Sequence, residues 1–186
     1  DQLTWTFQIN DRAVFSNGNK VTADAVKSSI ERVFEKSDRA RTFFDYTEMK
    51  ADGQTLIIKT DKPVPGLPGM LADPLFIIID TTVTDRDYRS MGPICTGPYM
   101  VKSFSKAKAE MEANPNYWDG TVPFKKVEIP SIDDPNTRAM ALQSGEVDMA
   151  VNISPGDLKL FTDSSRYRIS EIASPRTGPL YTSDLA

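Results

Sequence analysis

The chain has 186 residues, among them 22 Lys and Arg, 26 Asp and Glu and no His, which gives a formal net charge of −4. This length is enough for one ordinary domain or two small ones, and the mildly acidic balance argues against a nucleic-acid partner, which usually meets a basic patch. Because His is absent, Ser-His-Asp and Cys-His catalytic sites and zinc sites with imidazole ligands are excluded.

The clearest predicted element of the first half is a helix that begins after Thr22 and runs to about Lys36. Thr is a favoured N-cap because its hydroxyl accepts a hydrogen bond from a free N–H group of the first turn. Apolar residues fall at positions i, i+4, i+7 and i+8, which lie on one face of a helix. They are Val26, Ile30, Val33 and Phe34.

Short strands and turns surround this helix. Alternating aromatic and polar residues indicate one strand, and the dipeptide Asp52-Gly53 is typical of a tight hairpin turn. The predicted pieces are a strand at 4–9, a turn at 16–19, a hairpin within 43–61, a short helix at 66–72, a buried strand at 75–79 and a polar loop at 80–93. The first half is therefore more hairpin-like.

The second half alternates strands and helices. Asp134 reads as a helix N-cap, Pro135 as the first helical residue and Gly145 as the C-terminal stop. The dipeptide Ser154-Pro155 begins a second short helix. Strands are predicted at 96–104, 108–114, 125–132, 147–153, 167–174 and 178–185. This alternation predicts an α/β sheet.

Paired carboxylates are the residues that would support hydrolysis without His. Asp133 and Asp134 are adjacent, but Asp134 is already explained as a helix cap. No phosphate-binding glycine loop is present, and the acidic segment 80–87 does not have the ligand spacing of a calcium loop. We therefore expect a protein that is not an enzyme, with no catalytic residues, no metal site and no cofactor.

The segment "RARTFFDY" at 39–46 concentrates Arg and aromatic residues that would suit a small ligand. The guanidinium of Arg41 offers a planar fork for a carboxylate, and Phe43 and Phe44 offer apolar walls. The alternative is that the Arg side chains are solvated and that the two Phe residues belong to the core.

The segment "SPRTGPLY" at 174–181 is a second candidate. It places Arg176 and Thr177 between a proline and a glycine, in a kinked stretch. No helix is predicted there whose exposed face Arg176 would occupy. A ligand-binding role and a purely structural role are both open there.

Four stretches together resemble one family. They are "FSNGNKVTADAV" at 15–26, "CTGPYMVKSF" at 95–104, "NPNYWDG" at 114–120 and "IDDPNTRAMALQSGEVDMA" at 132–150. Their order and spacing resemble the family 5 extracellular solute-binding proteins, the peptide- and nickel-type receptors of ABC importers. Cys95 stands where the family pattern has Gly, and Ala25 stands where it has Asp.

The resemblance implies an α/β fold, part of the first lobe of a two-lobed periplasmic-binding-protein-like fold of type II, with a mixed sheet and flanking helices. Residues 1–92 would form an inserted small α+β subdomain and residues 93–186 a partial α/β core of that lobe. The chain would then be a fragment, without the hinge and the second lobe. In the family the Ser-Gly-Glu turn before Asp148 is scaffold, so Asp148 would have a structural role.

The resemblance also bears on the ligand. Nickel-type members use an Arg and a Trp in the segment that matches 39–46, where Arg41 and Phe43 stand here. A second Arg of those members falls near Phe76, and Arg176 would replace its charge. Peptide-type members rely on backbone pairing and on the second lobe. The expected ligand is therefore a peptide or a nickel-type metal chelate.

The implied function is that of the substrate-binding component of an ABC importer, which captures its ligand by closure of two lobes. The expected partners are this ligand and an ABC permease in the membrane, with no nucleic acid, and the protein is expected to be a monomer. It would lie outside the cytoplasm, in the periplasm or lipid-anchored at the cell surface. The alternative is the ligand-sensing domain of a transcriptional regulator with the same fold.

Overall fold

The computed structural model describes residues 2–171. The chain divides into two compact units, residues 1–131 and residues 132–186, and each is described by itself. No helix among the described residues is both long and apolar enough to cross a membrane.

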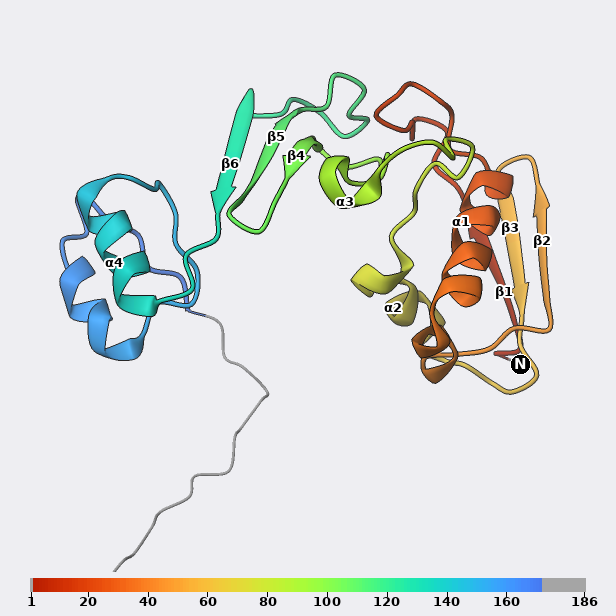
Figure 1. Cartoon of the computed structure of the whole chain (residues 1–186). Coiled ribbons are helices and arrows are strands. Elements are labelled where there is room, and N and C mark those ends of the chain that lie inside the picture. Colours follow the sequence, from red (N-terminus) through yellow and green to blue (C-terminus); the bar gives the residue numbers. More distant parts are fainter. Residues whose placement is uncertain (1, 172–186) are drawn as a thin grey trace, which may run out of the picture. The chain divides into compact units, whose positions relative to one another are not determined.

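The first unit begins with an antiparallel sheet in the order β1-β3-β2, formed by β1 (Thr4–Gln8), β2 (Glu48–Asp52) and β3 (Thr55–Lys59). Strands β2 and β3 form the predicted hairpin, and Gly53 at its turn has a φ of 58°, a conformation that costs glycine little. Helix α1 (Ala23–Lys36) packs along one face of this sheet (Figure 1).

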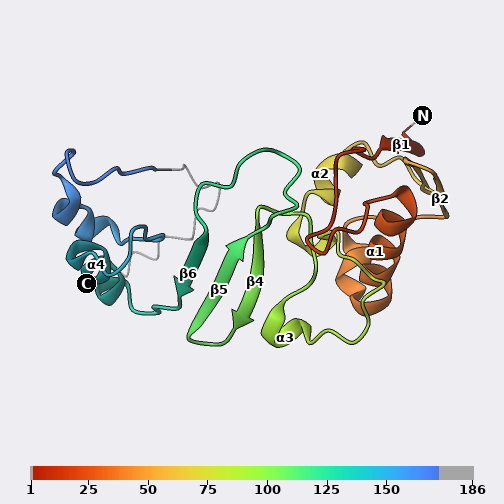
Figure 2. The ribbon, with the colours of Figure 1, turned by 90° about the horizontal axis from the view of Figure 1, so that it is seen from above.

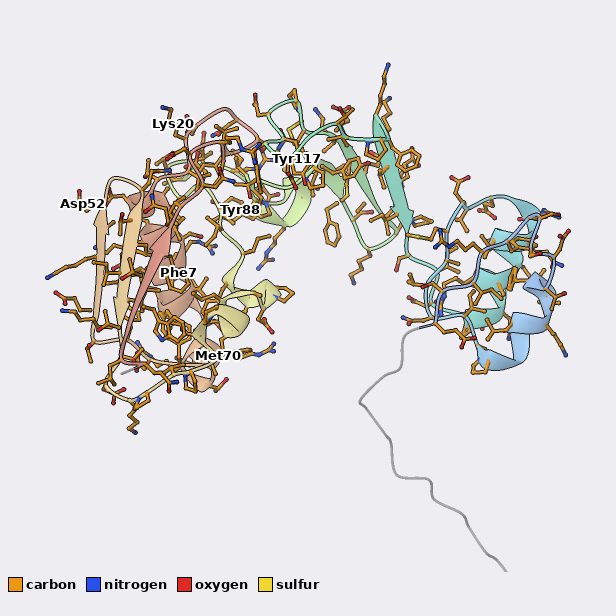
Figure 3. The ribbon with its side chains drawn as sticks, turned by 180° about the vertical axis from the view of Figure 1, so that it is seen from behind. Phe7, Lys20, Asp52, Met70, Tyr88 and Tyr117 are labelled. Atoms are coloured by element: carbon orange, nitrogen blue, oxygen red, sulfur yellow. The ribbon has the colours of Figure 1, made fainter. Side chains whose placement is uncertain are left out.

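Helix α1 confirms the prediction for this segment in detail. The Thr22 hydroxyl accepts a hydrogen bond from the Ala25 backbone N–H at 3.2 Å, as expected of an N-cap. The four apolar residues of the predicted face are all buried. They join a core with Phe15, Phe44, Met49, Leu56, Ile58, Leu67 and Phe76, against which Phe7 of β1 and Met70 of α2 (Leu67–Leu71) also pack (Figure 3).

The predicted buried strand at 75–79 is wrong. Pro74–Phe76 form the 3-10 turn η2, because the Asp73 carboxylate caps it by accepting from the Leu75 backbone N–H at 2.8 Å. The backbone of residues 77–79 then forms hydrogen bonds with a side chain instead of with a neighbouring strand. The buried Ser29 hydroxyl of α1 accepts from the Ile79 N–H at 2.9 Å and donates to the Ile77 carbonyl at 3.3 Å.

A second antiparallel sheet completes the first unit, in the order β4-β5-β6 (Figure 2). It consists of β4 (Tyr99–Phe104), β5 (Lys108–Ala113) and β6 (Lys126–Pro130), as the sequence predicted, and α3 (Tyr88–Met91) precedes it. Val101, Met111 and Val127 are aligned across the strands on one face.

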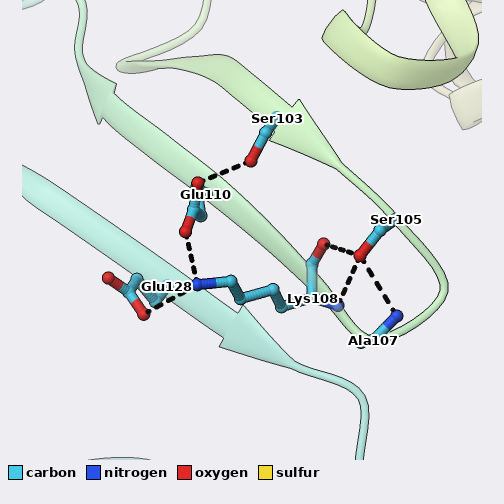
Figure 4. Close-up of polar contacts among 6 residues, drawn as sticks. All are labelled: Ser103, Ser105, Ala107, Lys108, Glu110 and Glu128. Carbon is cyan, nitrogen blue, oxygen red and sulfur yellow. Dashed lines mark hydrogen bonds and ion pairs between the residues drawn. The ribbon is translucent and has the colours of Figure 1, made fainter.

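The opposite face of this sheet is polar (Figure 4). Glu110 accepts a hydrogen bond from the Ser103 hydroxyl at 2.6 Å and pairs with Lys108, whose ammonium also lies 3.8 Å from Glu128. These contacts lower the pKa of Glu110 and raise that of Lys108. Side chains alternate between the faces of a strand, which explains why one β5 sequence serves both an apolar and a charged face.

The second unit contains α4 (Pro135–Ser144) and the 3-10 helix η3 (Pro155–Phe161). Asp134 caps α4 by accepting from the Thr137 N–H at 2.7 Å, and Gly145 ends it in the left-handed region with a φ of 82°, both as predicted.

The strands predicted at 147–153 and at the described start of 167–174 are not formed. A strand requires a neighbour for its backbone groups, and no described segment pairs with 147–153, where Asn152 also has a φ of 55°. The strand predicted at 178–185 lies outside the described residues.

Candidate ligand-binding site

The segment 39–46 lies on and just after the 3-10 helix η1 (Asp38–Thr42). Arg41 Nη1 donates to both carboxylate oxygens of Asp45, at 2.8 and 2.9 Å, and the Arg41 guanidinium lies 5.6 Å from the centre of the Phe34 ring. The Arg41 side chain is 55% exposed. The Asp45 carboxylate also accepts from the Tyr46 backbone N–H at 2.9 Å, which holds it in place.

An aromatic cluster lies beneath this ion pair. The Phe76 ring centre lies 5.6 Å from Phe43, 5.4 Å from Phe44 and 6.1 Å from Phe34. The structure therefore brings Arg41 and the three candidate Phe residues into one region. Phe44 and Phe76 are only 4% and 2% exposed, so they belong to the core, whereas Phe43 is half-buried.

Tyr46 adds a polar group to the aromatic cluster. Its ring meets Phe34 edge-on at 5.0 Å. Burial, followed by the nearby charge of Glu31, raises the pKa of Tyr46, and the Arg41 charge only partly opposes this. Ionisation of this phenol is therefore even less favourable than that of a free tyrosine, and its hydroxyl is available as a hydrogen-bond donor at the edge of the cluster. In the sequence, Tyr46 is indicated as part of this cluster by its position in the aromatic segment "RARTFFDY".

Arg176 and Thr177 lie outside the described residues, so their place relative to Arg41 stays a prediction. Among the residues that the structure describes, no group of three or more Cys, Asp and Glu is arranged to hold a metal ion.

Two hollows adjoin these elements in the first unit. An apolar one of about 330 Å³ lies between β1, α1 and α2, and Phe76 forms part of its wall together with Phe7, Ile30, Leu56 and Leu71. A more polar one of about 380 Å³ lies at the start of α1, with Lys20, Asp24, Asp80 and Thr82 in its lining. Phe76 thus contacts both the aromatic cluster and the apolar hollow.

Asp80 organises the turn at 16–19, a role that the sequence analysis did not assign. Its Oδ2 accepts from the side-chain amides of Asn17 and Asn19, both at 2.8 Å. Its Oδ1 accepts from the Thr82 backbone N–H at 3.0 Å and from the Thr82 hydroxyl at 2.6 Å. Burial opposes its ionisation, but these hydrogen bonds outweigh it and lower the pKa of Asp80 to about 2.

Three of the four family-like stretches meet at this turn. The Ser16 N–H donates to the Cys95 carbonyl at 2.8 Å, and the Asn116 side chain donates to the Ser16 carbonyl at 3.1 Å. Asn114 in turn donates to the Gly97 carbonyl at 2.8 Å. Burial raises the pKa of the Cys95 thiol to about 11, so the thiol stays protonated and unreactive. These stretches form a scaffold that connects the two sheets of the unit.

Comparisons with known proteins agree with this arrangement. The nickel-binding protein NikA of Staphylococcus aureus is 29% identical over 97% of this chain and 36% of its own length. Its structure in complex with Ni(L-His)2 matches with a TM-score of 0.73 and 32% identity, over 78% of this chain and 31% of that one. A nickel ABC transporter structure from Bacillus halodurans matches with a TM-score of 0.80 and 32% identity, over 86% of this chain and 33% of that one.

A third relative carries a different ligand in its name. The probable D,D-dipeptide-binding periplasmic protein DdpA of Escherichia coli is 28% identical over 97% of this chain and 37% of its own length. The chain thus spans about a third of the length of these relatives.

The helix and sheet arrangement is that of a solute-binding protein of the type II fold, of which this chain is a fragment. The family described as bacterial extracellular solute-binding proteins, family 5 Middle, matches residues 1–183. The chain belongs to this family. Its members are binding proteins and not enzymes, as the sequence analysis expected.

Proposed function

We propose that the intact protein is the substrate-binding component of an ABC importer and that it captures a peptide or a nickel-type chelate. The observation that carries this proposal is the family match, which runs along nearly the whole chain. The relatives are named for nickel and for a dipeptide, and their names support both ligand classes. None of the relatives named above is described as a regulator, so the regulator alternative has no support from them.

Arg41 is the residue of this chain that we propose for contact with a ligand carboxylate. Asp45 engages only Nη1, and among the described residues no hydrogen bond reaches Nε or Nη2 of Arg41. A ligand carboxylate would therefore bind the open edge of the guanidinium or displace the exposed Asp45. Phe43 would form the adjoining apolar wall, with Phe44 and Phe76 behind it.

Two further assignments belong to the same proposal. Arg176 and Thr177 would add a second polar contact, since a peptide end or a chelator carries more than one charged group. Residues 1–92 would form the inserted subdomain of the first lobe and residues 93–186 part of its core. The protein would work as a monomer outside the cytoplasm, in the periplasm or at the cell surface, and deliver its ligand to a membrane permease.

Capture would proceed by closure of two lobes. A ligand stabilises the closed state only by its higher affinity for that state, and a contact made in both lobes supplies this difference. A chain with about a third of the relatives' length makes only some of those contacts. We therefore expect the isolated 186-residue chain to bind weakly, and sub-micromolar binding by it would contradict two-lobe capture.

The first experiment is to purify the intact protein without denaturation, release its bound molecules and identify them by mass spectrometry, with elemental analysis of the same sample. Peptides at close to one per protein would support the peptide reading. A stoichiometric metal with a small chelator would support the nickel-type reading. Release of neither from protein shown to be folded, together with no binding of peptides or Ni(II)-histidine in solution, would overturn the proposal.

The role of Arg41 is tested with Arg41→Ala in the intact protein. Loss of one charged hydrogen-bonding partner should weaken binding of Ni(II)-histidine or of the identified peptide by roughly 10- to 100-fold. Arg12→Ala is the matched control, because Arg12 also lies over an aromatic ring, Trp118 at 5.8 Å, but in the scaffold region. Equal affinities of the two variants would refute the assignment of Arg41 and leave the family function intact.

A further inference from the structure

Arg39 is a charged residue of the aromatic segment 39–46 that the proposed ligand contacts leave unused. It belongs to η1 and is exposed, and its guanidinium carbon lies 5.6 Å from the centre of the Phe43 ring. The Thr42 hydroxyl donates to the Arg39 backbone carbonyl at 2.7 Å, but in the described part of the chain no hydrogen bond or ion pair reaches the guanidinium group. Its positive charge is therefore not compensated by an ion pair there.

The backbone of η1 fixes where Arg39 lies. Ala40 is 0% exposed, its N–H donates to the Ser37 carbonyl at 3.0 Å, and its carbonyl accepts from the Phe43 N–H at 3.1 Å. A small buried residue thus anchors the turn and leaves the long side chains on either side of it in the sequence, Arg39 and Arg41, at the surface. The position of Arg39 is set by the core and by the backbone of the turn.

The two arginines lie over two rings of the same aromatic cluster. Arg39 lies over Phe43, which meets Phe76 edge-on at 5.6 Å. Arg41 lies over Phe34, whose ring centre is 6.1 Å from that of Phe76. Two guanidinium groups therefore adjoin the aromatic surface that we propose as the apolar wall for the ligand.

Stacking on a ring leaves the hydrogen-bonding edge of a guanidinium group available. The cation–π contact uses the face of the planar group, whereas its N–H donors point outward in the plane. In Arg41, Nη1 is already engaged by Asp45, whereas Arg39 has no such competitor among the described residues. Two parallel N–H groups match the two oxygens of a carboxylate, and such charged bidentate pairs are stronger than neutral hydrogen bonds.

We propose that Arg39 is a second ligand-contacting cation of this site, and that it binds a second carboxylate of the ligand while Arg41 binds the first. This inference rests on the proposed function and narrows it. Ligands with two carboxylates, such as a peptide with an acidic side chain or a chelate formed by two amino acids, are favoured over ligands with one. Contact with Phe43 restricts the Arg39 side chain before the ligand arrives, so less side-chain freedom is lost on binding.

The test compares the intact wild-type protein with Arg39→Ala by isothermal titration calorimetry, using two pairs of probes. The first pair is the dipeptides Ala-Glu and Ala-Gln, which differ by one carboxylate. The second is Ni(II) with two equivalents of L-histidine or of L-histidinamide, which lacks the carboxylate. Arg39→Ala should weaken binding of the carboxylate-rich member of a pair by roughly tenfold and of the other member by less than roughly twofold.

Two further variants separate a bidentate contact from a general effect of charge. Arg39→Lys keeps the charge without the planar fork and should restore only part of the lost affinity. Arg32→Ala is the matched control, because Arg32 also lies over an aromatic ring, Tyr88 at 5.4 Å, which is not one of the rings around Phe76. It should bind each probe as the wild type does. Circular dichroism confirms that each variant is folded.

The outcomes distinguish this inference from the proposed function. Equal affinities of wild type and Arg39→Ala, or a loss that is the same for both members of a pair, would overturn the assignment of Arg39 and leave the proposed function intact. An equal loss in Arg32→Ala would overturn the assignment as well, because it would show a general effect of positive charge. Absence of binding of all four probes by the folded wild type would overturn both.

Discussion

The two units of the chain differ in the interactions that stabilise each of them internally. The first unit buries the apolar face of α1 against a three-stranded sheet, with aromatic side chains filling the space beside it. In the described part of the second unit the buried apolar residues are Ala139, Ala141 and Phe161. Large apolar side chains there are exposed instead, namely Met140, Met149, Val151, Leu160 and Ile169.

In the second unit, hydrogen bonds from Arg side chains to backbone carbonyls connect separate segments of the chain. Arg138 donates to the backbone carbonyls of Ile132 and Asn152, and Arg166 donates to the carbonyl of Gln143. The difference teaches that an apolar pattern in the sequence predicts which face of a helix or strand is apolar. It does not predict whether another segment of the same chain packs against that face and buries it. The predictions below test this contrast, from the largest expected effect to the smallest.

The strongest test compares Leu56→Ala with Met149→Ala. Leu56 is 1% exposed and Met149 is 79% exposed. Removing the Leu side chain should lower the free energy of unfolding by about 2–5 kcal/mol, because a cavity remains in a packed core. The Met variant should change it by less than about 0.5 kcal/mol. Urea denaturation of the chain measures both, and similar losses would show that Met149 is covered.

The Asp80 cluster should contribute through its hydrogen bonds. Asp80→Asn should lower the free energy of unfolding by about 1–3 kcal/mol, since the donors at one of the two carboxylate oxygens would face an NH2 group and lose their acceptor. The effect depends on pH. The folded pKa of Asp80, about 2, lies below its ordinary value of 3.8. Its stabilisation is therefore complete above about pH 4 and is lost as the pH falls from there through about 2.

Acid titration of stability in the wild type, Asp80→Asn and the exposed-site control Asp61→Asn measures this. The Asp80 variant should lose part of the decline between pH 4 and 2, and the control should keep it. If the decline is unchanged in Asp80→Asn, then the Asp80 carboxylate is not held in its ionised form by this cluster.

Helix caps allow the same chemical change in both units. Thr22→Ala and Asp134→Ala each remove a side-chain acceptor from the first turn of a helix, α1 and α4 respectively. Each should cost about 1 kcal/mol locally. Hydrogen exchange should show loss of protection through the first unit for Thr22→Ala and only within 132–171 for Asp134→Ala. Loss of protection in both units from either variant would mean that they unfold as one.

The smallest effect is expected at the Arg41–Asp45 pair. Both side chains are more than half exposed, at 55% and 51%. Asp45→Asn should change the free energy of unfolding by at most about 0.5 kcal/mol, because exposed ion pairs are screened by water. A larger loss by urea denaturation would show that the pair supports the aromatic cluster beneath it and is not simply available to a ligand.

The candidate site shows how far sequence reasoning reaches. Arg41, Phe43 and Phe44 lie within four positions of one another, so their association follows from local spacing. Phe76 joins them through packing. The sequence did not predict the ion pair between Arg41 and Asp45 or the burial of Phe44 and Phe76. Both depend on how η1 and η2 pack against α1, and no pattern of neighbouring residues predicts this packing.

The sequence by itself determined the ends of α1 and α4, the hairpin at Gly53, the three strands of the second sheet and the family. These features depend on caps, turns and alternation among residues a few positions apart. Only the tertiary structure decided that residues 77–79 bond to Ser29 and that the turn at 16–19 is held by Asp80. Those partners are 48 to 63 residues apart in the chain, and a hydrogen bond to a distant side chain satisfies the backbone as well as a strand does.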